Sequence, residues 1–165
     1  MDSEAKSESI ILGWREWASL PFLGLPAIKA KIDTGARTSC LHAFDIFVEE
    51  EKEGTYVSFK VHPLQNNVSL VVPCRARLGD RRVVTDSGGH KEERFVIRTT
   101  LVLAGVKKRV ELTLTNRESM KFRMLIGRGA LKPFYIDPGQ SYLAGKSIKQ
   151  RRYLKELKGQ LVRDA

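Results

Sequence analysis

The sequence lacks the features that mark secreted and membrane proteins. Its 165 residues include only two cysteines, Cys40 and Cys74. No apolar run approaches the roughly 18 residues that a membrane span needs, and the polar first residues, 1–9, do not have the basic and apolar segments of a secretory signal. Two cysteines without such a signal are typical of free thiols in a reducing compartment. We therefore expect a cytoplasmic protein with no membrane partner.

Acidic residues are scarce relative to basic ones. The sequence has 29 Lys and Arg against 19 Asp and Glu, a formal net charge of +10. This excess favours an anionic partner, and charge alone does not choose among nucleic acid, a membrane surface and an acidic polypeptide. Basic residues gather in the segment 146–163, which has the spacing of a short helix. A solvated helical face is a simpler interpretation of that segment than an arm for nucleic acid, so nucleic acid is the less expected partner without being excluded.

Residues suited to a metal or a nucleotide cofactor are few. The histidines are His42, His62 and His90, and none belongs to a motif such as H-E-x-x-H. Cys40 and His42 have the spacing of neighbours on one face of a strand, but no second pair of ligands follows. The sequence has no G-x-x-x-x-G-K-[ST] loop to hold phosphates. We expect neither a metal nor any other cofactor.

The feature present in abundance is an alternation of apolar and polar residues with a period of two. Five segments rich in branched residues are predicted strands: 27–32, 56–61, 68–72, 95–103 and 110–115. Turn signals with glycine occur at 53–54, 78–80, 87–89 and 104–105. A single interior helical turn is expected at 127–131, where Pro133 stops it. The pattern predicts an all-β protein that closes into a barrel and carries a helical tail.

Two short motifs, far apart in the chain, carry the chemistry. Residues 32–36 read Ile-Asp-Thr-Gly-Ala and residues 124–128 read Met-Leu-Ile-Gly-Arg. An aspartic peptidase needs a carboxylate at the end of a buried strand, a small hydroxyl residue that fixes the loop, and a glycine where the chain packs tightly against its partner. The second motif suits the other half of such a site, because its branched residues can pack under the catalytic loop while its glycine lets the backbone turn.

These motifs resemble those of the bacterial retropepsin-like aspartic peptidases, a family often labelled "ATP-dependent zinc protease". The resemblance extends to the surrounding run 29–43, the glycines of 87–89 and the segment 134–137. The resemblance covers roughly residues 10–143. A lone D-[ST]-G is a weak signal, whereas the two-part pattern in this order is specific. The resemblance implies a closed acid-protease barrel in which residues 82–97 form the flap hairpin over the substrate and residues 44–78 are an insertion. It divides the chain into a flexible N-terminus (1–9), the barrel (10–143) and a basic helical tail (144–165).

The resemblance also implies the site and its partners. Asp33, Thr34 and Gly35 would be catalytic, and the substrate-binding residues would be Ala36, Arg37, Ser87, Gly88, Gly89, Ile126 and Arg128. Two carboxyl groups share the work in this chemistry, so the second Asp33 would come from another copy in a two-fold homodimer. The family is associated with ATP-grasp ligases that add glutamates to proteins. The expected activity is therefore an endopeptidase that cuts an acidic protein or peptide tail, with a functional link to such a ligase.

Several alternatives stay open. Asp33 could accept turn hydrogen bonds only, which is a common use of Asp before Gly, and the glycines 88 and 89 could form a plain hairpin turn. Asp86 begins a second D-[ST]-G match, but it follows Asp33 by only 53 residues, too few for a second lobe with its own core. A catalytically idle barrel that binds acidic protein or nucleic acid through its basic surface is the alternative function.

Arg37 is the main departure from the viral members of the family, which commonly carry an Asp at this position. Arg37 and Arg128 would repel each other if they were adjacent. Arg37 could bind a substrate carboxylate in a bidentate fork. It could equally be satisfied by a local acid such as Asp45 or Asp137.

Overall fold

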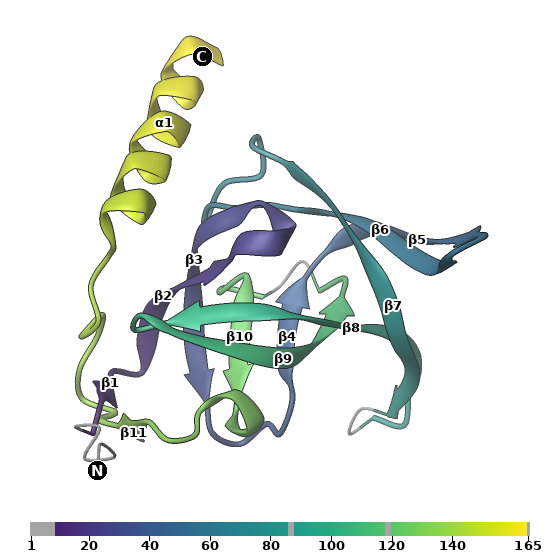
Figure 1. Cartoon of the computed structure of the whole chain (residues 1–165), viewed down its shortest axis with the longest axis horizontal. Helices are drawn as coiled ribbons and strands as arrows, with labels where there is room; N and C mark the ends of the chain where they lie inside the picture. The colour runs from purple at the N-terminus through teal and green to yellow at the C-terminus, as the bar shows by residue number, and fades with distance from the viewer. Residues whose placement is uncertain (1–8, 86–87, 118–119, 165) are drawn as a thin grey trace.

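The structure is a computed structural model that describes residues 9–85, 88–117 and 120–164. Strands dominate it, and one helix follows them near the end of the chain (Figure 1). The strands are β1 (Ile11–Leu12), β2 (Arg15–Leu20), β3 (Leu25–Asp33), β4 (Ser39–His42), β5 (Phe44–Glu51), β6 (Gly54–Val61), β7 (Val72–Thr85), β8 (Lys91–Leu103), β9 (Val106–Thr115), β10 (Met124–Gly127) and β11 (Tyr135–Ile136). The helical elements are η1 (Pro21–Leu23), η2 (Arg128–Ala130) and α1 (Ile148–Asp164).

Six of the strands close into a barrel. They follow the order β2-β3-β10-β4-β9-β8, and a further pairing of β2 with β8 joins the two edges. Ala18 is opposite Leu103 in that closing pair. Closure leaves no open edge between β2 and β8. The predicted all-β closed barrel is therefore confirmed.

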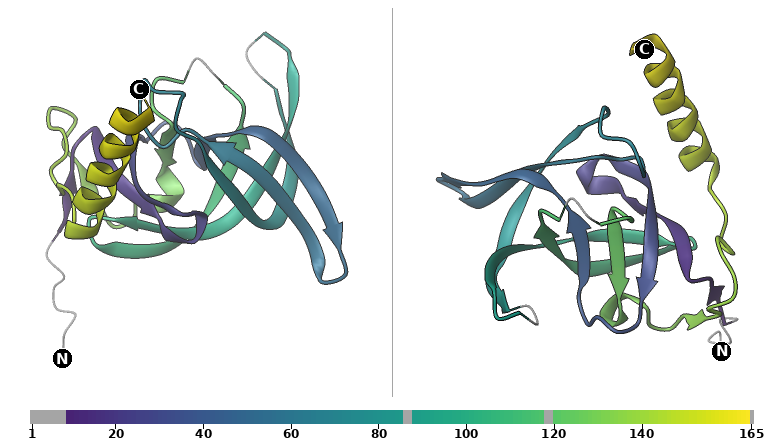
Figure 2. Two further views of the ribbon diagram at one scale, coloured as in Figure 1. Left: turned by 90° about the horizontal axis from the view of Figure 1, so that it is seen from above. Right: turned by 180° about the vertical axis from the view of Figure 1, so that it is seen from behind.

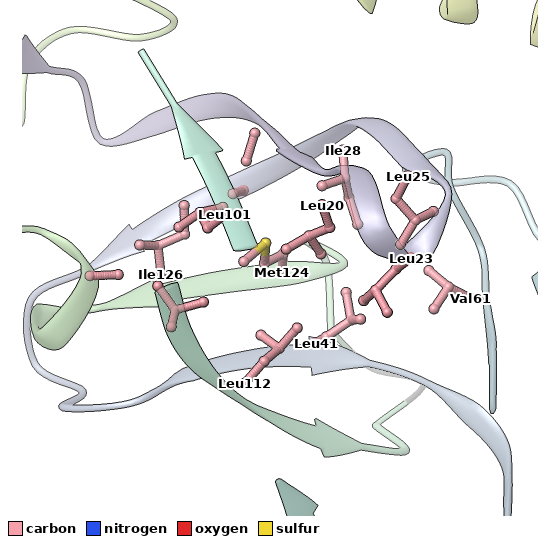
Figure 3. Packing of buried hydrophobic residues seen from close by; sticks show 14 of the residues in the cluster. Leu20, Leu23, Leu25, Ile28, Leu41, Val61, Leu101, Leu112, Met124 and Ile126 are labelled. Atoms are coloured by element: carbon pink, nitrogen blue, oxygen red, sulfur yellow. The ribbon is translucent and has the colours of Figure 1, made fainter. Parts of the chain in front are cut away.

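The interior of the barrel is apolar because the strands alternate in burial as the sequence alternates in polarity. On β3, Ala30 and Ile32 are buried while Lys31 between them is exposed. Figure 3 shows inward-pointing residues from β2, β3, β4, β8, β9 and β10 meeting at the centre, among them Leu20, Ile28, Leu41, Leu101, Leu112, Met124 and Ile126. Burial of this surface is the main favourable term in folding.

Beyond the barrel, the sheet continues from β8 through β7 and β6 to β5. The β5–β6 hairpin projects from the barrel (Figure 2, left) and accounts for much of the predicted insertion, 44–78. β7 and β8 form the hairpin predicted at 82–97, with Arg82 opposite Arg94. In Figure 1, the end of β7 lies at the same end of the molecule as the end of β3.

The helical tail is also confirmed. Ser147 and Gln150 cap α1 reciprocally, because Gln150 N donates to Ser147 Oγ (3.1 Å) and Ser147 N donates to Gln150 Oε1 (2.9 Å). Leu154 and Leu157 are buried, and α1 lies against β3. Within the described ranges, no helix is both long enough and apolar enough to cross a membrane. Residues 1–8 lie outside the described part, and the predicted domain boundaries stay predictions.

The predicted strand 68–72 is wrong, because only Val72 belongs to a strand. Local hydrogen bonds hold the preceding residues in a loop instead. The Asn67 carboxamide oxygen accepts from the backbone N–H groups of Ser69 and Leu70, both at 3.1 Å. The buried Arg123 donates to the backbone oxygens of Leu64 (3.3 Å) and Asn67 (3.2 Å).

Two smaller expectations also need correction. The glycine signal at 78–80 does not connect a hairpin; it is an irregularity within β7, where the register with β8 shifts between Leu78 and Asp80. The helical turn predicted at 127–131 is present as η2, but it is not the single interior turn, because η1 forms at Pro21–Leu23. The predicted turns at 53–54 and 104–105 do join strands.

Candidate active site

The two motifs meet because β3 and β10 are parallel neighbours in the barrel. Their register places Gly127 opposite Asp33 and Ile126 opposite Ile32. β10 also pairs with β4, so it lies between the two strands that the Asp33 loop connects (Figure 1). The topology therefore brings residues 33–38 and 127–129, about 90 positions apart in sequence, to one end of the barrel.

Asp33 is the last residue of β3, and its own loop orders it. Gly35 N donates to Asp33 Oδ1 (3.2 Å) and Ala36 N donates to the Asp33 backbone oxygen (3.2 Å). The Asp33 side chain is half-buried, whereas Thr34 and Gly35 are exposed. The bond from Gly35 N to the Asp33 side chain is that of an Asx turn, and the bond from Ala36 N to the Asp33 backbone oxygen closes a backbone turn. The Asx turn orients the carboxylate and leaves its second oxygen open to further partners.

The Gly-Arg motif holds the loop from the opposite side. Arg128 N donates to Ala36 O (2.7 Å), and Gly129 N donates to Arg37 O (3.0 Å). The Arg128 guanidinium reaches back to the backbone oxygen of Thr34 (3.0 Å). Three backbone oxygens of the Asp33 loop are thus satisfied by one short segment, which fixes the loop without using the Asp33 carboxylate.

Position 127 requires glycine because the backbone of the Asp33 loop lies very close to it. The expectation that Gly127 serves to let the backbone turn is therefore wrong. Its backbone is extended, with φ −85° and ψ 170°. A Cβ at this position would lie 2.7 Å from Thr38 C and O and 2.9 Å from Ala36 O. Only a residue without a side chain lets β10 pass this close to the Asp33 loop.

Ser39 also supports the contact between β10 and the Asp33 loop, a role that the sequence did not predict. It is buried, and its hydroxyl accepts a hydrogen bond from Gly127 N (3.0 Å). A serine after a Thr is an unremarkable pattern, so no local signal could have identified this role. The role depends on the pairing of β4 with β10, which is a property of the fold.

Arg37 is exposed and pairs with neither of the acids considered for it. Together with Arg109, Glu111 and Gly129 it lines a cavity of about 200 Å³. It forms no ion pair within the described residues. Asp45 pairs instead with Lys60 (3.1 Å), and Asp137 accepts from Gly139 N (3.0 Å). The alternative that Asp45 or Asp137 satisfies Arg37 is therefore wrong.

Of the remaining residues predicted to contact the substrate, one lies in the core and others lie on the β7–β8 hairpin. Ile126 is fully buried, so its side chain packs under the loop and is not available to a substrate. Gly88 and Gly89 are exposed at the turn of the β7–β8 hairpin, where Gly89 has φ +83°. Ser87 and Asp86 lie outside the described residues. Thr85 and Lys91, which flank residues 86–90, are paired strand residues.

A zinc site does not fit the residues that are present. Among the described residues, no group of three or more His, Cys, Asp and Glu side chains is placed to hold a metal ion. His42 stacks on His62 at 6.2 Å between ring centroids, and His42 Nδ1 accepts from Arg117 N (3.2 Å). That bond occupies one of the two nitrogens through which His42 would bind a metal.

The thiols do not supply a nucleophile. Cys40 and Cys74 are free, as predicted. Burial raises the pKa of Cys40 to about 11, with the nearby Arg94 and Arg117 opposing the shift, and raises that of Cys74 to about 12. Both are protonated near neutral pH, and a thiol is far less nucleophilic than a thiolate.

The closed barrel and the Asp-Thr-Gly loop held by a Gly-Arg strand define a retropepsin-like protein. The model of the RimB-like family, described as retropepsin-like aspartic endopeptidase RimB, matches residues 11–147. The chain belongs to this family. A solved structure of a Legionella pneumophila protein of unknown function is similar, with a TM-score of 0.66 and 25% identity over 83% of this chain and 99% of that one.

Curated relatives carry a different name. Proteins from Shewanella pealeana and Parasynechococcus marenigrum, each named "Probable alpha-L-glutamate ligase", are 44% and 47% identical to this chain over 137 and 140 residues. These matches cover 82% and 84% of this chain but only 30% of each relative. The chain thus spans less than a third of the length of these relatives, and the family domain is one part of a longer protein there.

Proposed function

We propose that the chain is an aspartic endopeptidase whose active site forms when two copies bring their Asp33 carboxyl groups together. The observation that supports this most directly is the Asp33 loop. Arg128 and Gly129 satisfy its backbone oxygens, and the Asp33 carboxylate accepts one hydrogen bond, from Gly35 N. The family to which the chain belongs is described as an endopeptidase of this class.

The mechanism uses the two carboxyl groups in opposite protonation states. Two carboxyl groups in contact do not both ionise readily, so the pair shares one proton. The ionised Asp33 takes a proton from water as the water oxygen attacks the scissile carbonyl carbon, while the protonated Asp33 donates to the carbonyl oxygen. The resulting tetrahedral species collapses when the carbon–nitrogen bond breaks and a proton is transferred to the departing nitrogen.

Other residues of the loop would act across the two-fold axis. The Thr34 hydroxyl forms no hydrogen bond with the described residues of its own chain, which suits a bond to the partner loop. Gly35 would present its carbonyl to the substrate backbone, Ala36 would line the cleft, and Arg37 would bind a substrate carboxylate. The flap turn with Ser87, Gly88 and Gly89 would close over the bound chain.

The substrate we propose is an acidic protein tail. The net charge of +10 favours encounter with an anion, and the relatives that contain this domain are named as glutamate ligases. A functional link to such a ligase follows naturally, because an enzyme that removes glutamates would reverse their addition. Cytoplasmic localisation and the need for no cofactor stay predictions.

The first prediction is that Asp33→Asn abolishes cleavage without unfolding the protein. Asn preserves the shape of the side chain but can act neither as a general base nor as a carboxylic acid. We expect loss of at least about a thousand-fold in kcat/KM, measured by mass spectrometry of peptide-library cleavage, with an unchanged circular dichroism spectrum. Activity of the unaltered protein should survive a metal chelator.

Asp137→Asn is the matched control, because Asp137 also accepts a hydrogen bond from the glycine amide two residues on. It should leave the activity unchanged. If Asp33→Asn cleaves as well as the unaltered chain, or if zinc restores activity lost in chelator, the proposed chemistry is wrong. If neither protein cleaves any peptide while both bind acidic ones, the idle barrel is the better description.

A further inference from the structure

A groove is lined by residues of β2, β3, the turn 104–105 and α1. In Figure 1, α1 lies toward the start of β3, away from the end of that strand, where Asp33 lies. The groove consists of two cavities of about 730 Å³ and 520 Å³ that share Trp17 and Lys146. The larger is bounded by the turn 104–105 and the segment 144–150, and the smaller by residues 63–65 and α1. We call this the Trp17 groove.

The charged residues that line the Trp17 groove are all basic. They are Lys29, Lys107, Lys108, Arg109, Lys146, Lys149, Arg151, Lys155 and Lys158. No Asp or Glu is among the described residues that line either cavity. None of the nine cations forms an ion pair with a described residue, whereas Arg75, Arg82 and Arg98 elsewhere on the surface each pair with an acid.

The basic residues are also close enough to affect one another. Lys29 Nζ lies 5.5 Å from the Trp17 ring centroid and Lys146 Nζ lies 5.4 Å from it. Burial lowers the pKa of Lys29, and the positive charges of Arg15, Lys146 and Lys158 lower it further. Gathering like charges opposes folding. An arrangement that costs stability and serves no internal pairing is typical of a binding site.

The tail fixes the geometry of the groove. Gln150 Nε2 donates to Ala18 O on β2 (3.3 Å), and Leu154 and Leu157 are buried. This anchoring places Lys149, Arg151, Lys155 and Lys158 of α1 along the groove. The match to the family model ends at residue 147, just before α1 begins, so the helix adds a feature beyond the matched domain.

We propose that the Trp17 groove binds a carboxylate-rich polypeptide segment at a site that shares Arg109 with the Arg37 cavity but includes no residue of the Asp33 loop. The groove is lined by apolar side chains such as Pro21, Val102 and Leu64, which suit the methylene groups of glutamate side chains.

The cations placed over the Trp17 ring favour a carboxylate-rich polypeptide over nucleic acid. Proteins that bind single-stranded nucleic acid usually offer aromatic faces on which bases stack. The Trp17 ring instead has the ammonium groups of Lys29 and Lys146 over it. Those groups interact favourably with the ring and present positive charge to the groove, which serves carboxylates better than bases.

The position of the groove suits a substrate that also reaches Asp33. Lys29 precedes Asp33 by four residues on β3, which is about 13 Å along an extended strand. An extended polypeptide spans that distance with about four residues. The groove could thus hold one part of an acidic chain while another part enters the cleft. Delivery of the chain to the cleft rests on the proposed endopeptidase function, whereas binding in the groove does not.

The second prediction tests binding in an Asp33→Asn background, in which cleavage does not interfere. The probes are fluorescent oligoglutamate and oligoglutamine peptides of equal length, measured by anisotropy at low and high salt. The triple change Lys29→Gln, Lys146→Gln and Lys158→Gln should weaken oligoglutamate binding by at least about ten-fold. Oligoglutamine should bind weakly to both proteins, and high salt should reduce the difference between them.

The control removes the same charge elsewhere, with Lys52→Gln, Lys121→Gln and Arg163→Gln, which are exposed basic residues outside both the groove and the flap hairpin. It should weaken binding by less than about three-fold, through the general field alone. Equal losses in both triple variants would overturn the proposal. Tighter binding of an oligouridylate than of oligoglutamate, lost in the same groove variant, would also overturn it in favour of nucleic acid.

Thermal unfolding separates a binding defect from a folding defect. Without ligand, the single change Lys29→Gln should change the Tm little, because relief of the repulsion by Arg15, Lys146 and Lys158 offsets the lost contact with the Trp17 ring. Oligoglutamate should raise the Tm of the Asp33→Asn protein but not that of the groove variant. The outcome is independent of Asp33 chemistry, so failure here would leave the proposed endopeptidase function standing.

Discussion

At the scale of single residues, two glycines of the candidate site differ in what requires them. A Cβ on Gly127 would overlap the backbone of Thr38, whereas a Cβ on Gly35 would meet only Asp33 Oδ1, at an ordinary 3.4 Å. Gly35 does not have a left-handed backbone either. The single chain therefore explains why residue 127 is glycine but not why residue 35 is. The approach of a second copy would explain the latter.

The third prediction follows from this contrast. Gly127→Ala should lower the free energy of unfolding by about 1 to 3 kcal/mol, because the overlap is with backbone and forces the loop to move. Gly35→Ala should change it by less than about 0.5 kcal/mol but should abolish cleavage. Urea denaturation and peptide cleavage measure the two effects. An active Gly35→Ala protein would mean that no partner chain packs against this residue.

Arg37 is the residue on which substrate choice would depend. It is exposed beside the Asp33 loop, and no described acid pairs with it. Its guanidinium is therefore available to a substrate carboxylate. Arg128, by contrast, already donates to Thr34 O, so its role is to hold the loop.

The fourth prediction is that Arg37→Ala lowers kcat/KM for a glutamate-rich peptide by about ten-fold or more, the loss of a charge-assisted hydrogen bond. The same change should barely affect cleavage of a matched glutamine-rich peptide. The losses should shrink at high salt. Equal losses on both peptides, or no dependence on salt, would show that Arg37 is structural.

At the scale of the elements, the sequence predicted best where burial alternates regularly. The segments 56–61, 95–103 and 110–115 lie in β6, β8 and β9 because one face of each strand enters a core. Short strands such as β4 and β10 have only four residues each. They are too brief to show a period, and the pairing that makes them strands comes from the rest of the barrel.

The failure at 68–72 has a tertiary cause. Its branched residues favour a strand, but Arg123, more than 50 positions away, binds the backbone of the preceding loop. Asn67 then turns the chain through its side chain. No local pattern contains information on a buried arginine that arrives from another part of the barrel.

The candidate site likewise has parts that the sequence predicted and parts that depend on the fold. The two motifs were enough to predict that residues 32–36 and 124–128 belong to one site, because each has a distinctive sequence and their order is that of the resembled family. Ser39 and the Trp17 groove were not predicted. The groove arises from the docking of α1 through Gln150 and Leu154, and the sequence shows only that the helix is basic.

At the scale of the whole molecule, one chain supplies one candidate acid loop. Asp86 lies outside the described residues, and the last residues of β7 before it alternate between half-buried and exposed, whereas β3 carries the buried Ile32 directly before Asp33. If the chemistry needs two carboxyl groups in contact, the functional unit is a pair of chains with the site on their two-fold axis. Activity per chain should then depend on how many chains are paired.

The fifth prediction is that Asp33→Asn protein inhibits the unaltered protein when the two are mixed. Each mixed pair has only one Asp33 carboxyl group and is inactive, so about a ten-fold excess of the variant should lower activity per unaltered chain to about a tenth. Diluting the unaltered protein alone should also reduce its specific activity, in parallel with dissociation seen by sedimentation. An equal excess of Asp137→Asn protein should not inhibit, because its pairs retain both Asp33 side chains. If excess Asp33→Asn protein leaves the activity unchanged, and specific activity does not vary with concentration, then a single chain is the active unit and the shared dyad is wrong.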